Sequence, residues 1–532
     1  MKRLGLILLL VIGVPAVVAA AEPFNPLEAS IPELQAAMGA GRTSAAALVD
    51  YYFARMDAFD EGDTGLNAIA VRNPRARQTA ELLDRERAER GPRGPLHGIP
   101  VLVKDNFETR GMPTSVGSVL FRNFAPDRDA LLVQRLRAAG AVILGKTNMH
   151  EFAYGITTVG SAFGATRNPY DPSRNPGGSS GGTGAAVAAN MAVFGLGSDT
   201  CGSIRIPAAH NALVGLRGTQ GLLSRRGIVP LSHTQDIGGP LTRSVLDLAL
   251  ALDALVGYDP QDPQTADSVG QTPPAYSRAL DPRALEGARI GLLEDLLLQE
   301  PADAAVADVI GRAAHDMESL GATIVRVSMP GLVAMLSARQ QGFFVLVHDF
   351  KTDINAYLEA NPDAPVHSLA ELIAADAHHP QIDASLRASE AMTDDSRFEY
   401  LEALQERAGV RRMVLGMMAE QKLDAIAYPS IRRVAAPIGE EQPGGNCLLS
   451  ANTGLPALTL PAGFTASGMP VGIELVAEPW SEPKLLSLGF AFEQGGPRRR
   501  PPPLGVEPGA AAATGDAEAT PPAPPRAVPD LD

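Results

Sequence analysis

The sequence predicts an α/β fold with a single large mixed, mostly parallel β-sheet whose two faces are covered by helices. A strand, a helix and a second strand follow each other in residues 98–148 and again in residues 288–328. Such alternation is typical of helix-covered, largely parallel sheets. The chain has 532 residues, of which 45% are hydrophobic and 20% charged, so it has the length for one large sheet and the composition of a globular protein.

The first residues have the pattern of a secretory signal peptide. Lys2 and Arg3 precede an uncharged apolar run that ends in small residues. We therefore expect a cleaved signal peptide in residues 1–20. A retained membrane anchor is the alternative, but the run is short for a span of about 20 residues and contains Pro15. Cleavage predicts a periplasmic or secreted protein with no stable membrane span.

We expect one domain over residues 21–496. Residues 28–90 carry apolar side chains at helical spacing, and residues 330–420 are mainly helical in pattern, as an insertion covering an active site would be. Residues 497–532 are rich in proline and alanine and almost lack bulky apolar side chains. Such a segment cannot offset its ordering entropy by burial, so we predict a disordered tail.

Charge and cysteine content argue against three classes of protein. The formal net charge is −15, which argues against a nucleic-acid partner because binding phosphates requires a basic surface. The only cysteines are Cys201 and Cys447, too few for a disulfide scaffold or a cysteine-rich zinc site.

Three short motifs match known patterns in the wrong context. GAVILGKT, residues 140–147, fits a phosphate-binding loop, but its central residues are typical of a strand. GSSGG, residues 178–182, fits a nucleophile elbow, yet it follows a loop, and His210, His233 and His315 lie in no recognisable catalytic setting. SEPK, residues 481–484, has the sequence of an exposed turn.

Residues 175–207 are the most informative stretch. They contain two glycine-rich loops with serines, joined by a helix of small residues. Glycine allows successive backbone amides to point at a ligand, and a serine beside such amides has a ready oxyanion site. A flexible linker is the alternative, but linkers are seldom followed by a tightly packed apolar helix and a second glycine loop.

A serine nucleophile needs a base, and Lys104 is the candidate. It ends the apolar run from Ile99 to Val103, so burial is expected to disfavour its ammonium form and lower its pKa. Only six of the 45 basic residues are lysines, and arginine in this place would not deprotonate. A structural salt bridge between Lys104 and Asp105 is the alternative.

Together, these motifs resemble the amidase signature family over nearly all of residues 28–494. The matching segments include PLHGIPVLVKDN, GKTNMHEFAYG, RNPYDPSRNPGGSSGG, DTCGSIRIPA, TGLPALTLPAGF and PVGIELV. The resemblance implies the amidase signature fold and a Ser-cisSer-Lys catalytic group. Ser203 would then be the nucleophile, Ser179 the serine with the cis peptide bond and proton bridge, and Lys104 the base.

The resemblance also implies an acyl-enzyme mechanism without metal or organic cofactor. Neutral Lys104 would take a proton from Ser179, which would take one from Ser203 as Ser203 attacks the amide carbonyl. The expected oxyanion donors are the backbone N–H groups of Thr200, Cys201, Gly202 and Ser203. The residues expected to support these loops are Ser180, Asp199 and Arg205. Cys201 departs from the family pattern, which usually has glycine there, so a side chain is attached to an oxyanion-loop residue and is expected to narrow the pocket.

The expected activity is hydrolysis of a carboxylic amide to an acid plus ammonia or an amine. The motifs look most like those of bacterial aryl- or alkyl-amide amidases, and a peptide amidase acting on C-terminal peptide amides is the next candidate. A protein that supplies ammonia to a tRNA-bound substrate fits poorly with export. A catalytically silent binding protein is the alternative from another class, although Lys104, Ser179 and Ser203 are all retained. We expect a monomer or a homodimer.

Cys201 and Cys447 are candidates for a disulfide. Export implies an oxidising compartment, and the segment around Cys447 resembles a family segment near the active site. Two unpaired thiols are the alternative. The two Cα atoms must lie within about 7 Å for the bond to form.

Overall fold

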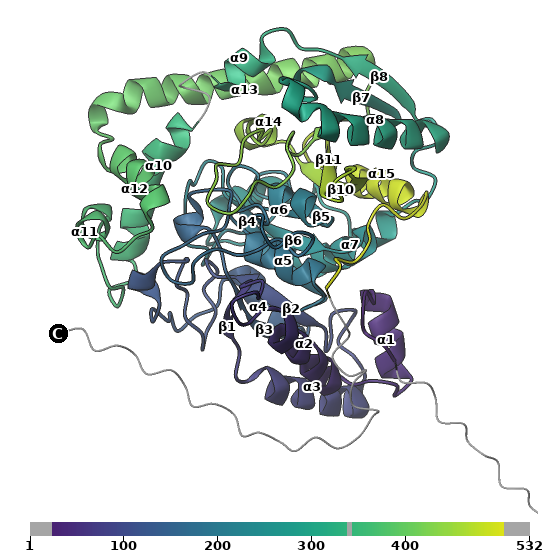
Figure 1. The fold of residues 1–532 in the computed structure, drawn as a ribbon, viewed down its shortest axis with the longest axis vertical. Helices are drawn as coiled ribbons and strands as arrows, with labels where there is room; N and C mark the ends of the chain where they lie inside the picture. Colours follow the sequence, from purple (N-terminus) through teal and green to yellow (C-terminus); the bar gives the residue numbers. More distant parts are fainter. Residues whose placement is uncertain (1–23, 338–342, 505–532) are drawn as a thin grey trace, which may run out of the picture.

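Within residues 24–337 and 343–504, which the computed structural model describes, eleven strands form one mixed sheet (Figure 1). Their spatial order is β1-β3-β2-β4-β6-β5-β10-β11-β9-β7-β8. The strands are β1 Ile69–Arg72, β2 Pro100–Lys104, β3 Val142–Thr147, β4 Phe194–Asp199, β5 Val214–Arg217, β6 Ile237–Thr242, β7 Arg289–Leu293, β8 Thr323–Val327, β9 Ala425–Pro429, β10 Ala457–Phe464 and β11 Pro470–Val476.

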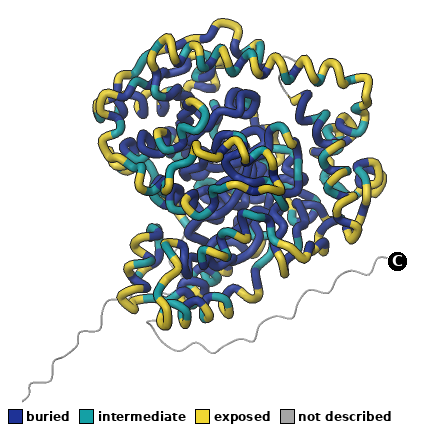
Figure 2. The backbone as a smooth tube through the Cα atoms, turned by 180° about the vertical axis from the view of Figure 1, so that it is seen from behind, coloured by how far each residue is buried: buried dark blue, intermediate teal, exposed yellow. Residues whose placement is uncertain are grey.

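The helices surround this sheet, as the amphipathic segments predict. They are α1 Ile31–Gly39, α2 Ala45–Phe59, α3 Ala76–Arg90, α4 Leu131–Ala138, α5 Gly181–Ala188, α6 Arg205–His210, α7 Val245–Leu255, α8 Ala304–Ser319, α9 Leu332–Ser337, α10 Phe344–Glu359, α11 Leu369–Ala374, α12 Pro380–Glu390, α13 Arg397–Gln421, α14 Leu448–Thr453 and α15 Glu482–Gln494. Buried residues concentrate at the centre of the molecule, and exposed ones follow the outer helices (Figure 2).

The single mixed sheet agrees with the prediction, but the expected parallel majority is wrong. Of the strand pairs in the described part of the chain, four are parallel and six are antiparallel. The parallel pairs involve β2 and β7, which belong to the strand–helix–strand units visible in the sequence. In the middle of the sheet, β5, β6, β10 and β11 pair antiparallel. Loops without a helix join β5 to β6 and β10 to β11, whereas β5 and β10 are distant in sequence.

Helix α5 is buried along its whole length, and its small residues explain how. Every residue from Gly181 to Ala188 is buried. A Cβ atom on Gly182 would lie 2.2 Å from the carbonyl oxygen of Asn148, so a larger residue does not fit there. This close packing fixes the two glycine-rich loops at the ends of the α5–β4 unit.

Residues 332–337 and 343–421 are mainly helical and arch around one side of the sheet (Figure 1). The side chains of α10 connect this arch to the body: Asp349 accepts a hydrogen bond from Ser232 at 2.6 Å, and Tyr357 donates one to Glu108 at 3.0 Å. Tyr154 on the body also contacts Ser389 of α12 at 2.8 Å.

The prediction of a disordered tail from residue 497 is wrong for residues 497–504, which pack on the body. Arg499 forms an ion pair with Glu28 at 2.6 Å, with only 10% of its side chain exposed. The guanidinium groups of Arg498 and Arg500 lie over the rings of Phe492 and Phe464, 3.8 and 4.1 Å from the centroids. The three arginines thus pack residues 497–504 onto the body, a role that bulky apolar side chains usually have.

The predicted signal peptide, residues 1–20, and residues 505–532 of the predicted tail lie outside the described residues. Among the helices that are described, none is long and apolar enough to cross a membrane.

We predict that ending the chain after Gly496 lowers the melting temperature, whereas ending it after Leu504 does not. The first truncation removes the Arg499–Glu28 ion pair and both arginine–aromatic contacts. Each such contact is worth about 0.5–2 kcal/mol, so in a chain of this length the expected loss is on the order of a few degrees. Thermal unfolding of the two truncated proteins and the full chain measures the difference. Equal melting temperatures would show that residues 497–504 do not stabilise the fold.

Candidate active site

Lys104 lies at the end of β2 with none of its surface exposed. Its Nζ is 2.7 Å from the Ser179 Oγ, 2.8 Å from the Ser198 Oγ and 3.4 Å from the Ser198 carbonyl oxygen. Asn106 donates a further hydrogen bond to the Ser198 Oγ at 3.0 Å. The amine is therefore held by hydroxyl and carbonyl oxygens without a carboxylate in direct contact.

The alternative role for Lys104, a salt bridge with Asp105, does not occur. The cation that pairs with Asp105 is Lys146 of β3, at 3.0 Å, and both side chains are fully buried. Burial lowers the pKa of Lys104 to about 7, against the opposing negative charges of Asp199 and Asp236. A substantial fraction of Lys104 is therefore a neutral amine near neutral pH.

Ser179 lies in the first glycine loop, and its preceding peptide bond, Gly178–Ser179, is cis, as the resemblance implies. Its carbonyl oxygen accepts a hydrogen bond from the backbone N–H of His150 at 3.0 Å. Ser180 immediately precedes helix α5, and its Oγ donates to the carbonyl oxygen of Ser198 at 3.2 Å. The first loop is thereby fixed to the strand that carries Ser198.

Ser203 lies in the turn between β4 and α6, and is 3% exposed. The backbone N–H of Ser180 donates to its carbonyl oxygen at 3.2 Å, which brings the two glycine loops together. A hydrogen bond between the side chains of Ser179 and Ser203 is absent from those formed by the described residues. The structure thus joins Lys104 to Ser179 directly, and joins Ser203 to the same loop through the backbone.

The predicted oxyanion donors divide into two groups. In the described part of the chain, the N–H groups of Thr200, Cys201 and Ser203 have no hydrogen-bond acceptor. The prediction for Gly202 needs correction, because its N–H donates to the Asp199 Oδ1 at 2.7 Å. Gly202 has φ +86°, and an added Cβ would lie 2.7 Å from the Ile206 Cδ1, so its role here is to permit the turn.

Asp199 is the anchor of this turn. Arg205 pairs with it at 3.0 Å and Arg217 at 3.1 Å, and Arg205 also pairs with Glu474 at 2.7 Å. Burial alone would raise the pKa of Asp199, but the two guanidinium groups hold it well below its usual range. A carboxylate that stays charged keeps its bonds to Gly202 and Ile204, and so maintains the turn before and after Ser203.

Cys201 and Cys447 form a disulfide, as predicted, with their Cα atoms 5.1 Å apart. The bond joins the turn that carries Ser203 to the N-terminal end of α14 across a sequence separation of 246 residues. Arg205 reaches the same place, with its Nη2 3.4 Å from the Cys447 carbonyl oxygen. The cysteine that departs from the family pattern is thus part of a covalent crosslink.

A cavity of about 280 Å³ opens beside Ser203. The body contributes Thr200, Cys201 and Leu231 to it. Helical-insertion residues form the facing wall, where Phe343, Leu346 and Val347 supply apolar surface. The remaining lining residues are Ala153, Tyr154, Gly155, Ile156 and Ser385.

Several residues that contact the catalytic loops were not predicted from the sequence. Ser198 contacts Lys104, and its position next to Asp199 in GLGSDT was the available signal. Gln235 donates to the Thr200 carbonyl oxygen at 3.3 Å and accepts from Arg407 at 3.0 Å. Arg217 is a second partner of Asp199. All three residues make contacts between segments distant in sequence. For Gln235 and Arg217, no local motif indicates these contacts.

The rejected motifs have structural roles. Residues 142–147 form β3, so the phosphate-loop pattern is a strand. His210 contacts the Arg433 carbonyl oxygen, and Lys484 forms an ion pair with Asp424.

The comparisons with known proteins agree with this geometry. The Amidase family model matches residues 47–486. The chain belongs to the amidase family, characterised by the amidase signature.

Relatives within the family differ in activity. The chain is 37% identical to a glutamyl-tRNA(Gln) amidotransferase subunit of Moorella thermoacetica, covering 85% of this chain and 94% of the relative. It superimposes on the peptide amidase of Stenotrophomonas maltophilia with a TM-score of 0.84 and 40% identity, covering 91% of this chain and all of the other. A bacterial aryl acylamidase gives a TM-score of 0.77 and 26% identity, with coverage of 88% and 96%.

We predict that kcat/KM falls as the pH drops below about 7, following a single ionisation. Lys104 acts as a base only when neutral, and its pKa of about 7 means that lower pH protonates it. Rate–pH profiles measure this limb.

The histidine variants His150→Gln, His210→Gln and His233→Gln are the controls. Burial, with His379 and Lys104 nearby, lowers the pKa of His150 to about 3, and burial lowers that of His210 to about 4. Each variant should retain the limb near pH 7. Loss of the limb in a folded histidine variant would assign the base to that histidine.

We predict that the double variant Cys201→Ser, Cys447→Ser is less stable than the wild type under oxidising conditions. By chain entropy, closing a loop of 246 residues is worth up to about 5 kcal/mol. Urea unfolding with and without a reductant measures the effect. Reduction should bring the wild type to the level of the variant and leave the variant unchanged. Two free thiols in the intact mass of the wild type would contradict the bond.

Proposed function

We propose that this protein hydrolyses a carboxylic amide through an acyl-enzyme on Ser203. One observation carries the proposal: a fully buried Lys104, with its pKa lowered to about 7, has its Nζ 2.7 Å from the Ser179 Oγ. A structural lysine in a protein interior is expected beside a carboxylate, as Lys146 is beside Asp105. Lys104 instead has the partners of a base.

The proposed first step is attack on the amide carbonyl. Neutral Lys104 accepts the Ser179 proton while Ser179 accepts the Ser203 proton, so the Ser203 Oγ attacks without passing through a free alkoxide. The negative charge develops on the carbonyl oxygen. The N–H groups of Thr200, Cys201 and Ser203 are the proposed donors to it, and one such donor is typically worth about 3 kcal/mol.

Collapse of the tetrahedral intermediate breaks the carbon–nitrogen bond. The proton held by Lys104 returns through Ser179 to the leaving nitrogen, which departs as ammonia or an amine. Water then attacks the ester on Ser203, giving up its proton through the same relay. The acid leaves, and Ser203 regains its hydrogen.

The proposed substrates have a small apolar acyl group. The cavity beside Ser203 holds about 280 Å³ and presents Phe343, Leu346 and Leu231, which suits an aryl or alkyl amide. C-terminal peptide amides are the second candidate, supported by the 40% identity to the peptide amidase over its whole length. The net charge of −15 favours both over a role in modifying a tRNA-bound substrate.

We further propose that the protein is exported. The pattern of residues 1–20 supports this, and so does the Cys201–Cys447 disulfide, since disulfides persist in oxidising compartments. The intact mass of protein purified under non-reducing conditions tests both features together. It should lack about 20 N-terminal residues and two hydrogens; a full-length mass would contradict cleavage.

We predict that Lys104→Ala, Ser179→Ala and Ser203→Ala each reduce kcat on the order of 10³-fold or more in a folded protein. Each substitution removes one member of the same proton relay, so combining the substitutions should lower kcat little further. Initial rates on a panel of aryl amides, alkyl amides and peptide amides measure this and rank the two substrate classes.

Ser118→Ala is the matched control, because Ser118 is also a buried serine, 2% exposed, and takes no part in the relay. It should retain activity and label with a fluorophosphonate probe, whereas Ser203→Ala should not label. Turnover of Ser203→Ala like that of the wild type would refute the mechanism. Absence of both turnover and labelling in the wild type would favour the silent binding protein.

A further inference from the structure

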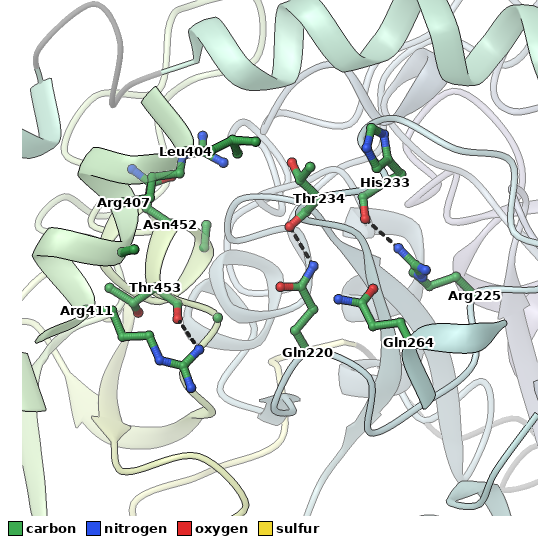
Figure 3. Close-up of a pocket in the computed structure, with 13 residues that line it drawn as sticks. Gln220, Arg225, His233, Thr234, Gln264, Leu404, Arg407, Arg411, Asn452 and Thr453 are labelled. Atoms are coloured by element: carbon green, nitrogen blue, oxygen red, sulfur yellow. Dashed lines mark hydrogen bonds between the residues drawn. The ribbon is translucent and has the colours of Figure 1, made fainter. Parts of the chain in front are cut away.

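A second, larger cavity of about 590 Å³ lies between α13, α14 and the loops that follow β5 and α7 (Figure 3). Arg407 and Arg411 of α13 lie on one side with Asn452 of α14. Gln220 and Gln264 lie on the opposite side. This cavity shares no lining residue with the one beside Ser203.

The cavity is lined by positive charge without negative charge. Its lining includes three arginines and no aspartate or glutamate. Arg225 is compensated from outside by Asp262, at 2.6 Å, and His233 by Asp353, at 2.9 Å. Within the described ranges, neither Arg407 nor Arg411 of α13 forms an ion pair. Neither arginine therefore has a described carboxylate in direct contact, and the negative charge of Asp349 acts on Arg407 only from beyond ion-pair distance.

Arg407 is almost completely buried, with 5% of its surface exposed. Its Nη2 donates to the Gln235 Oε1 at 3.0 Å, while its buried Nε has no partner among the described residues. Burial lowers the pKa of Arg407 to about 10, so it stays protonated at neutral pH. Burial disfavours this charge and the more distant Asp349 opposes that effect only in part, so an anion in the cavity would stabilise the guanidinium further.

Arg411 and Gln264 provide further donors. Arg411 is half-buried, and its Nη1 donates to the Thr453 carbonyl oxygen at 3.0 Å. Its other N–H groups, and the side-chain amide of Gln264, have no acceptor in the described part of the chain. A guanidinium presents several parallel donors, which match the geometry of carboxylate and phosphate oxygens.

We propose that this cavity is a binding site for a small organic anion, held through a carboxylate or phosphate group by Arg407 and Arg411. Its volume of about 590 Å³ exceeds what a single inorganic ion fills, leaving room for the rest of an organic molecule. Gln264 and Asn452 supply polar groups beside the two arginines. The site does not depend on the proposed amide hydrolysis, since it uses none of the relay residues.

Calorimetric titration of the purified protein at low salt tests the proposal. The probes are succinate, inorganic phosphate and, as the neutral match of succinate, 1,4-butanediol. At least one anion should bind and the diol should not. Binding of succinate alone assigns a carboxylate ligand, and binding of phosphate alone assigns a phosphoryl group. Heat that does not depend on either anion would overturn the proposal.

Arg411→Gln is the test variant and Arg412→Gln its matched control. Arg412 is the next residue of α13, is exposed and does not line the cavity. Loss of a charged hydrogen-bond donor should weaken binding about tenfold or more in Arg411→Gln, while Arg412→Gln should retain the affinity of the wild type. Equal affinities in all three proteins would place the bound anion elsewhere and overturn the site.

A second variant keeps the test valid if Arg411→Gln unfolds. Gln264→Ala removes a donor from the opposite wall, and this side chain has no hydrogen bond to described residues. Its binding should weaken while its melting temperature stays unchanged. Affinity unchanged in a folded Gln264→Ala protein, together with an unfolded Arg411→Gln, would count against the proposal.

Discussion

The site depends on the exclusion of water from the amine of Lys104. An ammonium group loses its hydration when it is buried, and this cost alone favours the neutral form. The fold removes the group from water at the end of β2 and surrounds it with the oxygens of Ser179 and Ser198. It also supplies Asp105, the adjacent carboxylate, with a different cation, Lys146. Had Asp105 paired with Lys104, the ammonium form would have been favoured.

In the turn around Ser203, buried groups keep their charge. Asp199 forms ion pairs with Arg205 and Arg217, and Arg205 forms a further ion pair with Glu474. Removing one member of such a network would leave an uncompensated buried charge, which typically costs about 3–5 kcal/mol. The same protein interior therefore holds an amine with a pKa lowered to about 7 and, one residue beyond its partner Ser198, a carboxylate that stays charged.

The sequence predicted those parts of the molecule that local patterns encode. The buried run before Lys104, the small residues of α5 and the β7–α8–β8 unit all depend on neighbours along the chain, and each has the expected structure. The parallel majority was wrong because antiparallel pairing such as that of β5 with β10 joins strands distant in sequence, and no local pattern shows the direction in which such strands meet. Gly202 was misjudged because its amide is taken by a side chain, Asp199, rather than left free. Residues 497–504 were misjudged because arginine was counted as a polar residue, although its stem and guanidinium pack on aromatic rings. Gln235 and Arg407 meet only in three dimensions, so no local motif reveals them.

The disulfide also changes the topology of the chain. Residues 201–447 become a closed covalent ring, and the whole helical arch of residues 332–337 and 343–421 lies inside it. A protease that cuts an exposed connection of the arch therefore opens the ring without dividing the molecule. The two pieces would migrate separately only after reduction. A single cut in an exposed connection of the arch would thus leave both glycine loops and the sheet joined in one covalent unit.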